Sequence, residues 1–151
     1  MMKFVLAVMI MAFTVMDATA GDKEDVIAAR SAAIEAWNGT DVDKIRAHYA
    51  DGFTLFQRDG SLLVPGGWNW ETVREMYADG LKVTVGPVRH LDVKIYGNTA
   101  LITGYGTVNV TLPGSEPTIT TDRATSVWVK RDGVWKAVHQ HASLLTPPQP
   151  D

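Results

Sequence analysis

The hydrophobic pattern of the chain changes its period near residue 82. Before that point apolar residues recur at helical spacing in separate stretches, and after it they alternate with polar residues as strands do. Helices followed by a run of strands predict an α+β fold. In such a fold we expect the sheet to bury one face on the helices.

Three helices are predicted in the first half. Asp22 is the expected N-cap of the first, a Thr40 capping box begins the second, and Asn69 caps the third. A short hairpin with an Asp59-Gly60 turn lies between the second and third helices. The predicted helical ranges are 22–38, 40–50 and 69–79, and the hairpin strands are 53–56 and 61–64.

The second half predicts four consecutive strands. Turn residues separate them, and the Asp132-Gly133 pair is the sharpest hairpin signal in the chain. Strands that follow one another so closely must pair antiparallel. The predicted ranges are 82–96, 100–112, 118–130 and 134–145.

The two ends of the chain are expected to lie outside the domain. Residues 1–20 have a basic start, a short apolar run and small residues at 18–20, which predicts a signal peptide cleaved before Gly21. An uncleaved membrane anchor is the alternative. We therefore expect a secreted or periplasmic protein with one domain over 21–146 and a proline-rich tail over 147–151.

The amino-acid composition excludes several classes of function. The chain has no cysteine, which excludes thiol, iron–sulfur and cysteine–zinc chemistry. The net charge is −3 and Lys and Arg do not cluster, so the sequence shows no basic patch that would bind nucleic acid. After removal of the leader it shows none that would bind a membrane surface either. A small molecule is the expected partner.

The last hairpin carries the candidate site. Strict alternation puts His139 and His141 on the side of Trp135, and pairing across the turn would place Ser126 opposite His139 and bring Trp128 near Ala137. Aromatic, histidine and hydroxyl side chains on one concave face predict a pocket wall. The alternative is that the tryptophans are core and the histidines are structural hydrogen-bonding groups.

Other chemistry has weaker support in the sequence. His139 and His141 are spaced for a metal, but nothing places His90 or Asp92 beside them, so we expect no metal and no cofactor. Ser143 lacks the strained turn of a nucleophilic serine. Acid–base catalysis by a single pocket histidine remains open.

The run from Arg123 to Ser143 resembles the C-terminal hairpin of the nuclear transport factor 2-like superfamily. It is similar in particular to SnoaL-like members and to the association domain of calcium/calmodulin-dependent protein kinase II. The resemblance implies an α+β cone, a curved sheet wrapped around the first helix, with a cavity and usually a homodimer. Ser126 and Ala142 stand where the kinase domain tends to carry arginine, which argues against an anionic ligand unless Arg123 compensates.

The leading hypothesis is a dimeric small-molecule-binding domain. The alternatives are a cofactor-free isomerase, dehydratase or cyclase that uses His139 or His141, and a module for oligomerisation only. The expected pocket residues are Trp37, Tyr49, Tyr105, Arg123, Ser126, Trp128, Trp135, His139 and His141.

Overall fold

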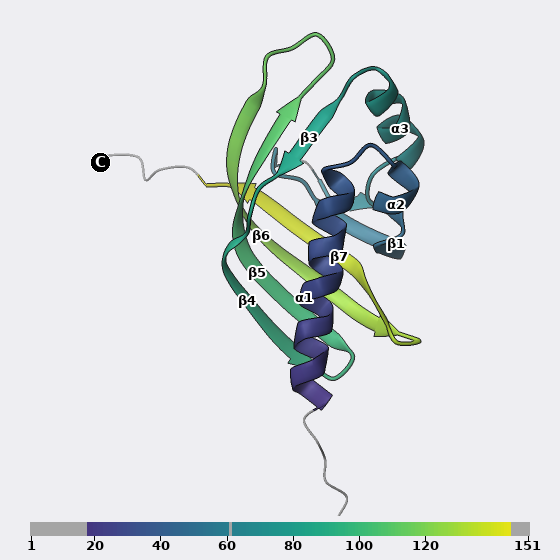
Figure 1. Ribbon diagram of the computed structural model, residues 1–151, viewed down its shortest axis with the longest axis vertical. Coiled ribbons are helices and arrows are strands. Elements are labelled where there is room, and N and C mark those ends of the chain that lie inside the picture. The colour runs from purple at the N-terminus through teal and green to yellow at the C-terminus, as the bar shows by residue number, and fades with distance from the viewer. Residues whose placement is uncertain (1–17, 61, 146–151) are drawn as a thin grey trace, which may run out of the picture.

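The computed structural model describes residues 18–60 and 62–145 and places the helices against one face of a curved sheet (Figure 1). The predicted tail over 147–151 and most of the predicted signal peptide, residues 1–17, lie outside the described residues. Residues 18–20 begin the first helix. The helices are α1 (Ala18–Trp37), α2 (Val42–Arg46) and α3 (Trp70–Ala78). The strands are β1 (Tyr49–Phe56), β2 (Val64–Pro65), β3 (Lys82–Val85), β4 (Arg89–Tyr96), β5 (Thr99–Thr111), β6 (Thr118–Arg131) and β7 (Val134–Leu144).

The sheet has seven strands in the order β2-β1-β7-β6-β5-β3, and β4 also pairs with β5. The predicted antiparallel pairing of the last strands is confirmed. One pairing is new, because β1 lies parallel to β7 and the sheet is therefore mixed. We call the face that carries α1 the inner face and the opposite one the outer face (Figure 1).

Several element boundaries differ from the predicted ones. Asp22 is not a cap; it lies inside α1 and its carboxylate is 2.7 Å from the Lys130 ammonium of β6. The cap of α2 is Asp41, not Thr40, because its carboxylate accepts from two backbone N–H groups of the first turn. Pro87, which cannot donate to a ladder, lies in the break that divides the predicted strand 82–96 into β3 and β4.

The core lies between α1 and the inner face. Val26 and Ala33 of α1 are two turns apart and buried, and they belong to one cluster with Ile102, Trp128 and Trp135 of the sheet. Because the buried residues of α1 recur every seven positions, only one stripe of the helix meets the strands. The helix stays anchored on that stripe while its flanks remain open to other contacts.

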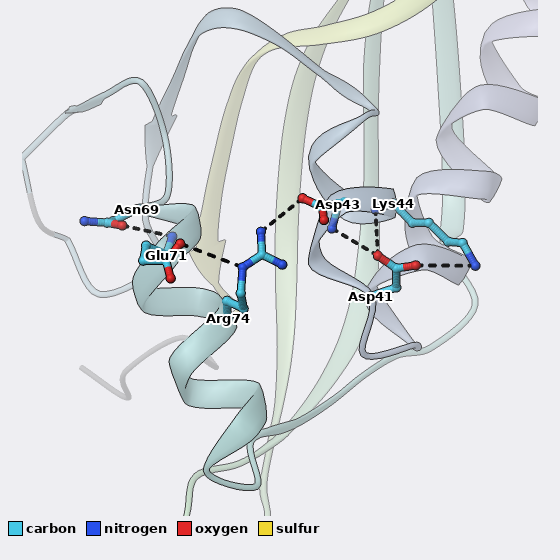
Figure 2. A network of polar contacts seen from close by, with 6 residues as sticks. All are labelled: Asp41, Asp43, Lys44, Asn69, Glu71 and Arg74. Carbon is cyan, nitrogen blue, oxygen red and sulfur yellow. Dashed lines mark hydrogen bonds and ion pairs between the residues drawn. The ribbon is translucent and has the colours of Figure 1, made fainter.

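Helices α2 and α3 are held together by a polar network (Figure 2). The Arg74 guanidinium of α3 lies 3.0 Å from the Asp43 carboxylate of α2 and 3.8 Å from Glu71. Asn69 caps α3 as predicted, since its side chain accepts from the N–H groups of Glu71 and Thr72. The exposed Arg74–Asp43 ion pair links the two helices, and α3 lies at the end of the molecule where α1 ends (Figure 1).

Candidate functional site

A β-bulge in β7 decides which side chains face the helices. Trp128 pairs with Ala137, but Val127 pairs with His139, so Val138 is an extra residue on β7. One extra residue turns every later side chain to the other face. The predicted pairing of His139 with Ser126 is therefore wrong: Gln140 lies opposite Ser126, and His139 and His141 are on the outer face.

The inner face holds a cavity of about 430 Å³ between α1, α3 and the sheet. This volume lies within the roughly 300–1,000 Å³ typical of small-molecule pockets. Its apolar wall includes Ile34, Leu55, Trp68, Val73, Met76, Leu81, Val83, Val108, Val110 and Trp128. Its polar groups are Arg30, Tyr49, Gln57, Arg58, Asp122, Ser126 and Gln140.

Aromatic side chains form one wall of the cavity. The Trp68 ring lies edge-on to Trp37 at 5.0 Å and to Tyr49 at 5.3 Å between centroids, and it stacks on Phe53 at 5.6 Å. Gly67 allows this stacking because its φ is +70° and a Cβ there would overlap the Phe53 ring. The loop before α3 is thus fitted to the aromatic wall.

Arg30 is the cation that α1 contributes to the cavity. Its side chain is half-buried, and within residues 18–60 and 62–145 it has neither a hydrogen bond nor an acidic partner. Burial lowers the pKa of the Arg30 guanidinium, and the nearby Tyr49 opposes that change. A positive charge therefore borders an apolar cavity without a neutralising group from the described protein.

Asp122 and Arg58 form a second polar feature of the wall. Asp122 of β6 is buried, and its Oδ2 lies 3.4 Å from Nη1 of Arg58, which also donates to Thr120 at 2.6 Å. The other carboxylate oxygen, Oδ1, is buried and has no hydrogen-bond partner. A buried carboxylate oxygen without a partner is rare in folded proteins and marks Asp122 as a candidate functional residue.

The structure divides the predicted pocket residues into two groups. Trp37, Tyr49, Ser126 and Trp128 line the cavity, and Trp135 is buried in the core. Tyr105 borders both the cavity and a smaller hollow on the outer face, where Arg123 and His141 lie.

His139 has an outer-face partner of its own. Its Nδ1 lies 2.8 Å from the Thr54 hydroxyl, and its ring meets Phe56 at 5.8 Å. The expected wall of two histidines and two tryptophans is therefore not formed, and Arg123 does not compensate for the missing arginines inside the cavity.

Three charged residues of the cavity were not predicted from the sequence: Arg30, Arg58 and Asp122. Arg30 lies one helical turn after Val26 and one turn before Ala33. Because both of those residues are buried, helical periodicity places Arg30 beside the buried face of α1. Asp122 lies four residues before Ser126 and six before Trp128 on the same strand. Alternation along the strand therefore predicts that all three side chains face the same side. Arg58 lies in a loop, whose course no periodicity predicts.

Residues 18–60 and 62–145 contain no group of three or more His, Cys, Asp or Glu side chains that could hold a metal ion. None of the helices in these ranges is long and apolar enough to cross a membrane.

The fold belongs to a class with solved representatives. A candidate dehydratase of the NTF2-like family from Streptomyces avermitilis superposes with a TM-score of 0.72 at 19% identity, over 85% of this chain and 99% of that one. The CaMKII association domain of C. elegans gives 0.65 at 22% identity, over 85% and 99% of the two chains. An NTF2-like protein of unknown function in nutrient uptake from Rhodospirillum rubrum gives 0.70 at 19%, over 81% and 99%. Helices on an open, curved sheet of this kind define the NTF2-like, cystatin-like α+β fold.

Sequence places the chain within that class. The family model described as a SnoaL-like domain matches residues 26–147, so the chain belongs to the SnoaL-like family. No curated protein matches it. The resemblance seen in the hairpin sequence is thereby confirmed. The fold neighbours include a candidate dehydratase and association domains, so the fold alone does not fix a function.

Proposed function

We propose that the protein binds a small amphipathic anion in its inner cavity, with the apolar body against the aromatic wall and the acidic end on Arg30. The observation that carries the proposal is Arg30 itself: a half-buried guanidinium beside an apolar cavity, without an acidic partner in the described protein. This reverses the expectation drawn from Ser126 and Ala142. Those positions lack arginine, but α1 supplies one from the other side of the cavity.

Electrostatics support an anionic ligand over a neutral one. A charge removed from water is destabilised unless it is paired, and the lowered pKa of Arg30 reflects that cost. A carboxylate would offset it with two parallel hydrogen bonds, a geometry suited to guanidinium. The Tyr49 hydroxyl accepts from Trp37 at 2.7 Å, so its own proton is free to donate to the same carboxylate.

The test uses residues 21–151 and matched ligands. Aromatic and medium-chain carboxylic acids are compared with their primary amides by thermal shift and by tryptophan fluorescence, since Trp37, Trp68 and Trp128 line the cavity. We expect the acids to stabilise the protein and the amides to bind about tenfold more weakly or worse. Equal binding of acid and amide would overturn the role of Arg30 while leaving cavity binding intact.

Arg30→Gln is the matching variant, and Arg46→Gln is its control because Arg46 is exposed on α2 and does not line the cavity. Arg30→Gln should remove the preference for the acid over the amide. Arg46→Gln removes the same charge from the molecule and should leave the preference unchanged. If both variants lose it equally, general electrostatic attraction explains the binding and the site is not Arg30.

A second function, an acid–base enzyme, is supported by Asp122. The four histidines do not line the cavity, so a catalytic histidine has no structural support, but Asp122 lines the cavity and its buried Oδ1 has no hydrogen-bond partner. A carboxylate in such a position can remove a proton next to a carbonyl group. We expect cyclic ketones to exchange their α-hydrogens in D₂O, followed by NMR, and Asp122→Asn to stop the enzyme-dependent exchange. Absence of exchange with the native protein would leave binding as the function.

Export and self-association complete the proposal. The sequence of residues 1–20 supports export, and the mature protein purified from its source should begin at Gly21 when measured by intact mass. Similarity to association domains supports a homodimer, to be measured by light scattering with size exclusion. An uncleaved N-terminus or a monomer at micromolar concentration would contradict these respective parts.

A further inference from the structure

We propose a second binding site, for a tetrahedral oxyanion of the phosphate or sulfate class, in the hollow on the outer face of the sheet. The hollow measures about 270 Å³ and lies on the opposite side of the strands from the cavity. Tyr105 borders both spaces, but Arg30 lies only on the cavity and Arg123 only on the hollow. Its occupation is therefore independent of the function proposed above.

Strand register brings the donors of this site together. Tyr105, Arg123 and Ser143 lie directly opposite one another on β5, β6 and β7. The next row on the same face is Thr103, Thr125 and His141. Two adjacent rows of hydroxyl, guanidinium and imidazole groups on neighbouring strands therefore face the same space.

Arg123 is the centre of the hollow. Its Nε–H donates to the Ser143 hydroxyl at 2.8 Å, which fixes the plane of the guanidinium. The two terminal nitrogens have no hydrogen bond or acidic partner within residues 18–60 and 62–145. An arginine held by one nitrogen and free at the others is prepared for a bidentate contact with an oxyanion.

His90 closes one side of the hollow. It has a φ of +51°, a left-handed conformation that non-glycine residues seldom adopt, and its ring lies edge-on to Tyr105 at 5.9 Å. Backbone strain of this kind concentrates at ligand sites. The bulge in β4 next to His90, between the pairings of Arg89 and Asp92, brings the imidazole to the edge of the site.

Charge favours an anion over a cation. The residues that line the hollow include one arginine and two histidines and no Asp or Glu. The nearest carboxylate by register is Asp92, opposite Thr103, and it is paired with Lys94 at 3.6 Å. Hydroxyl groups on three strands, in addition to the planar guanidinium, suit oxygens spread in three dimensions, as in a tetrahedral group. The space also admits the organic part of an ester.

The experiment titrates residues 21–151 with inorganic phosphate, inorganic sulfate and phenyl phosphate at one fixed pH, by calorimetry and by NMR of the imidazole nitrogens. We expect saturable binding that shifts the His141 and His90 signals. Phenyl phosphate binding more tightly than phosphate would identify an ester as the natural ligand class, and equal binding would identify the free ion. Dissociation constants weaker than about 10 mM for all three probes would overturn the proposal.

Arg123→Gln and Arg131→Gln provide the matched pair, because Arg131 is exposed at the end of β6 and outside the hollow. Arg123→Gln should weaken binding about tenfold or more, and Arg131→Gln should have little effect. Equal losses in the two variants would reduce the binding to nonspecific attraction and contradict the site. The proposal would also be overturned if the protein forms a dimer whose second copy covers His141. In that case the NMR signal of the His141 imidazole would not respond to any of the three probes.

Discussion

The indole N–H of Trp37 donates a 2.7 Å hydrogen bond to the hydroxyl of Tyr49. This bond joins the last residue of α1 to the first residue of β1, and both rings face the cavity. Tyr77 of α3 donates to the Trp37 carbonyl at 3.2 Å. Three elements therefore meet at one aromatic pair, which sets the opening between α1 and the sheet.

Tyr49 should ionise later than an ordinary tyrosine. Desolvation raises the pKa of Tyr49 to about 12, so its proton stays bound in the folded state after it is lost in the unfolded one. Stability is then complete below pH 10 and falls as the pH rises from 10 towards 12. Alkaline difference absorbance at 295 nm should show a late transition that Tyr49→Phe removes. Survival of that transition in Tyr49→Phe would assign it to another tyrosine.

Gly67→Ala should destabilise the protein by roughly 3 kcal/mol, the sum of left-handed backbone strain and overpacking. Its φ is +70° and the new Cβ would overlap the Phe53 ring. Gly66→Ala is the neighbouring control, because Gly66 has a φ of +77° but open space around its Cβ position. It should cost about 1 kcal/mol. Urea unfolding compares the two, and similar losses would show that backbone strain alone is responsible.

Arg58→Met should destabilise the fold by roughly 2 kcal/mol, less than the 3–5 typical of a fully buried pair, because the Arg58 side chain is one-third exposed. The loss arises from Asp122, whose buried carboxylate would keep no cation beside it. Adding Asp122→Asn to Arg58→Met should recover part of this energy. A double-mutant cycle measures the coupling, and strict additivity would mean that the two side chains do not interact.

Asn38→Asp should loosen β3 from the end of α1. The Asn38 side chain accepts from the Val85 N–H at 2.6 Å and donates to the Val85 carbonyl at 3.2 Å. A carboxylate cannot donate and would face that carbonyl, at a cost of about 1–2 kcal/mol. Asn98→Asp, at the exposed turn before β5, is the control. Hydrogen exchange of the Val85 amide should accelerate in Asn38→Asp only.

Periodicity predicted the fold because each of its signals is local. The helical stripe of α1, the Asn69 cap and the Asp132-Gly133 turn depend on neighbouring residues, and each appears in the structure where the sequence places it. The bulge at Val138 has no local sequence signature, because the alternation of polar and apolar residues in β7 does not indicate where an extra residue is inserted. It separates Trp135 and Ala137, which are buried on the inner face, from His139, which lies on the outer face beside Thr54 of β1.

The candidate site was predictable only in part for the same reason. Trp128 has the parity of a buried strand residue, and it lines the cavity in the structure. The histidines were not, because a one-residue shift moves polar side chains between faces without changing their spacing. Arg30 and Asp122 become visible only when α1 and β6 are brought together around the same cavity.

The parallel pairing of β1 with β7 has a consequence for how the chain acquires its structure. Thr54 and His139 are partners although they stand 85 residues apart in the sequence. Such non-local pairing is slow to form, and here β1 gains its partner only after nearly the whole chain has been synthesised. Until β7 is available, β1 has no strand partner on that side and the core between α1 and the sheet cannot close, so refolding should wait for the C-terminal hairpin to dock.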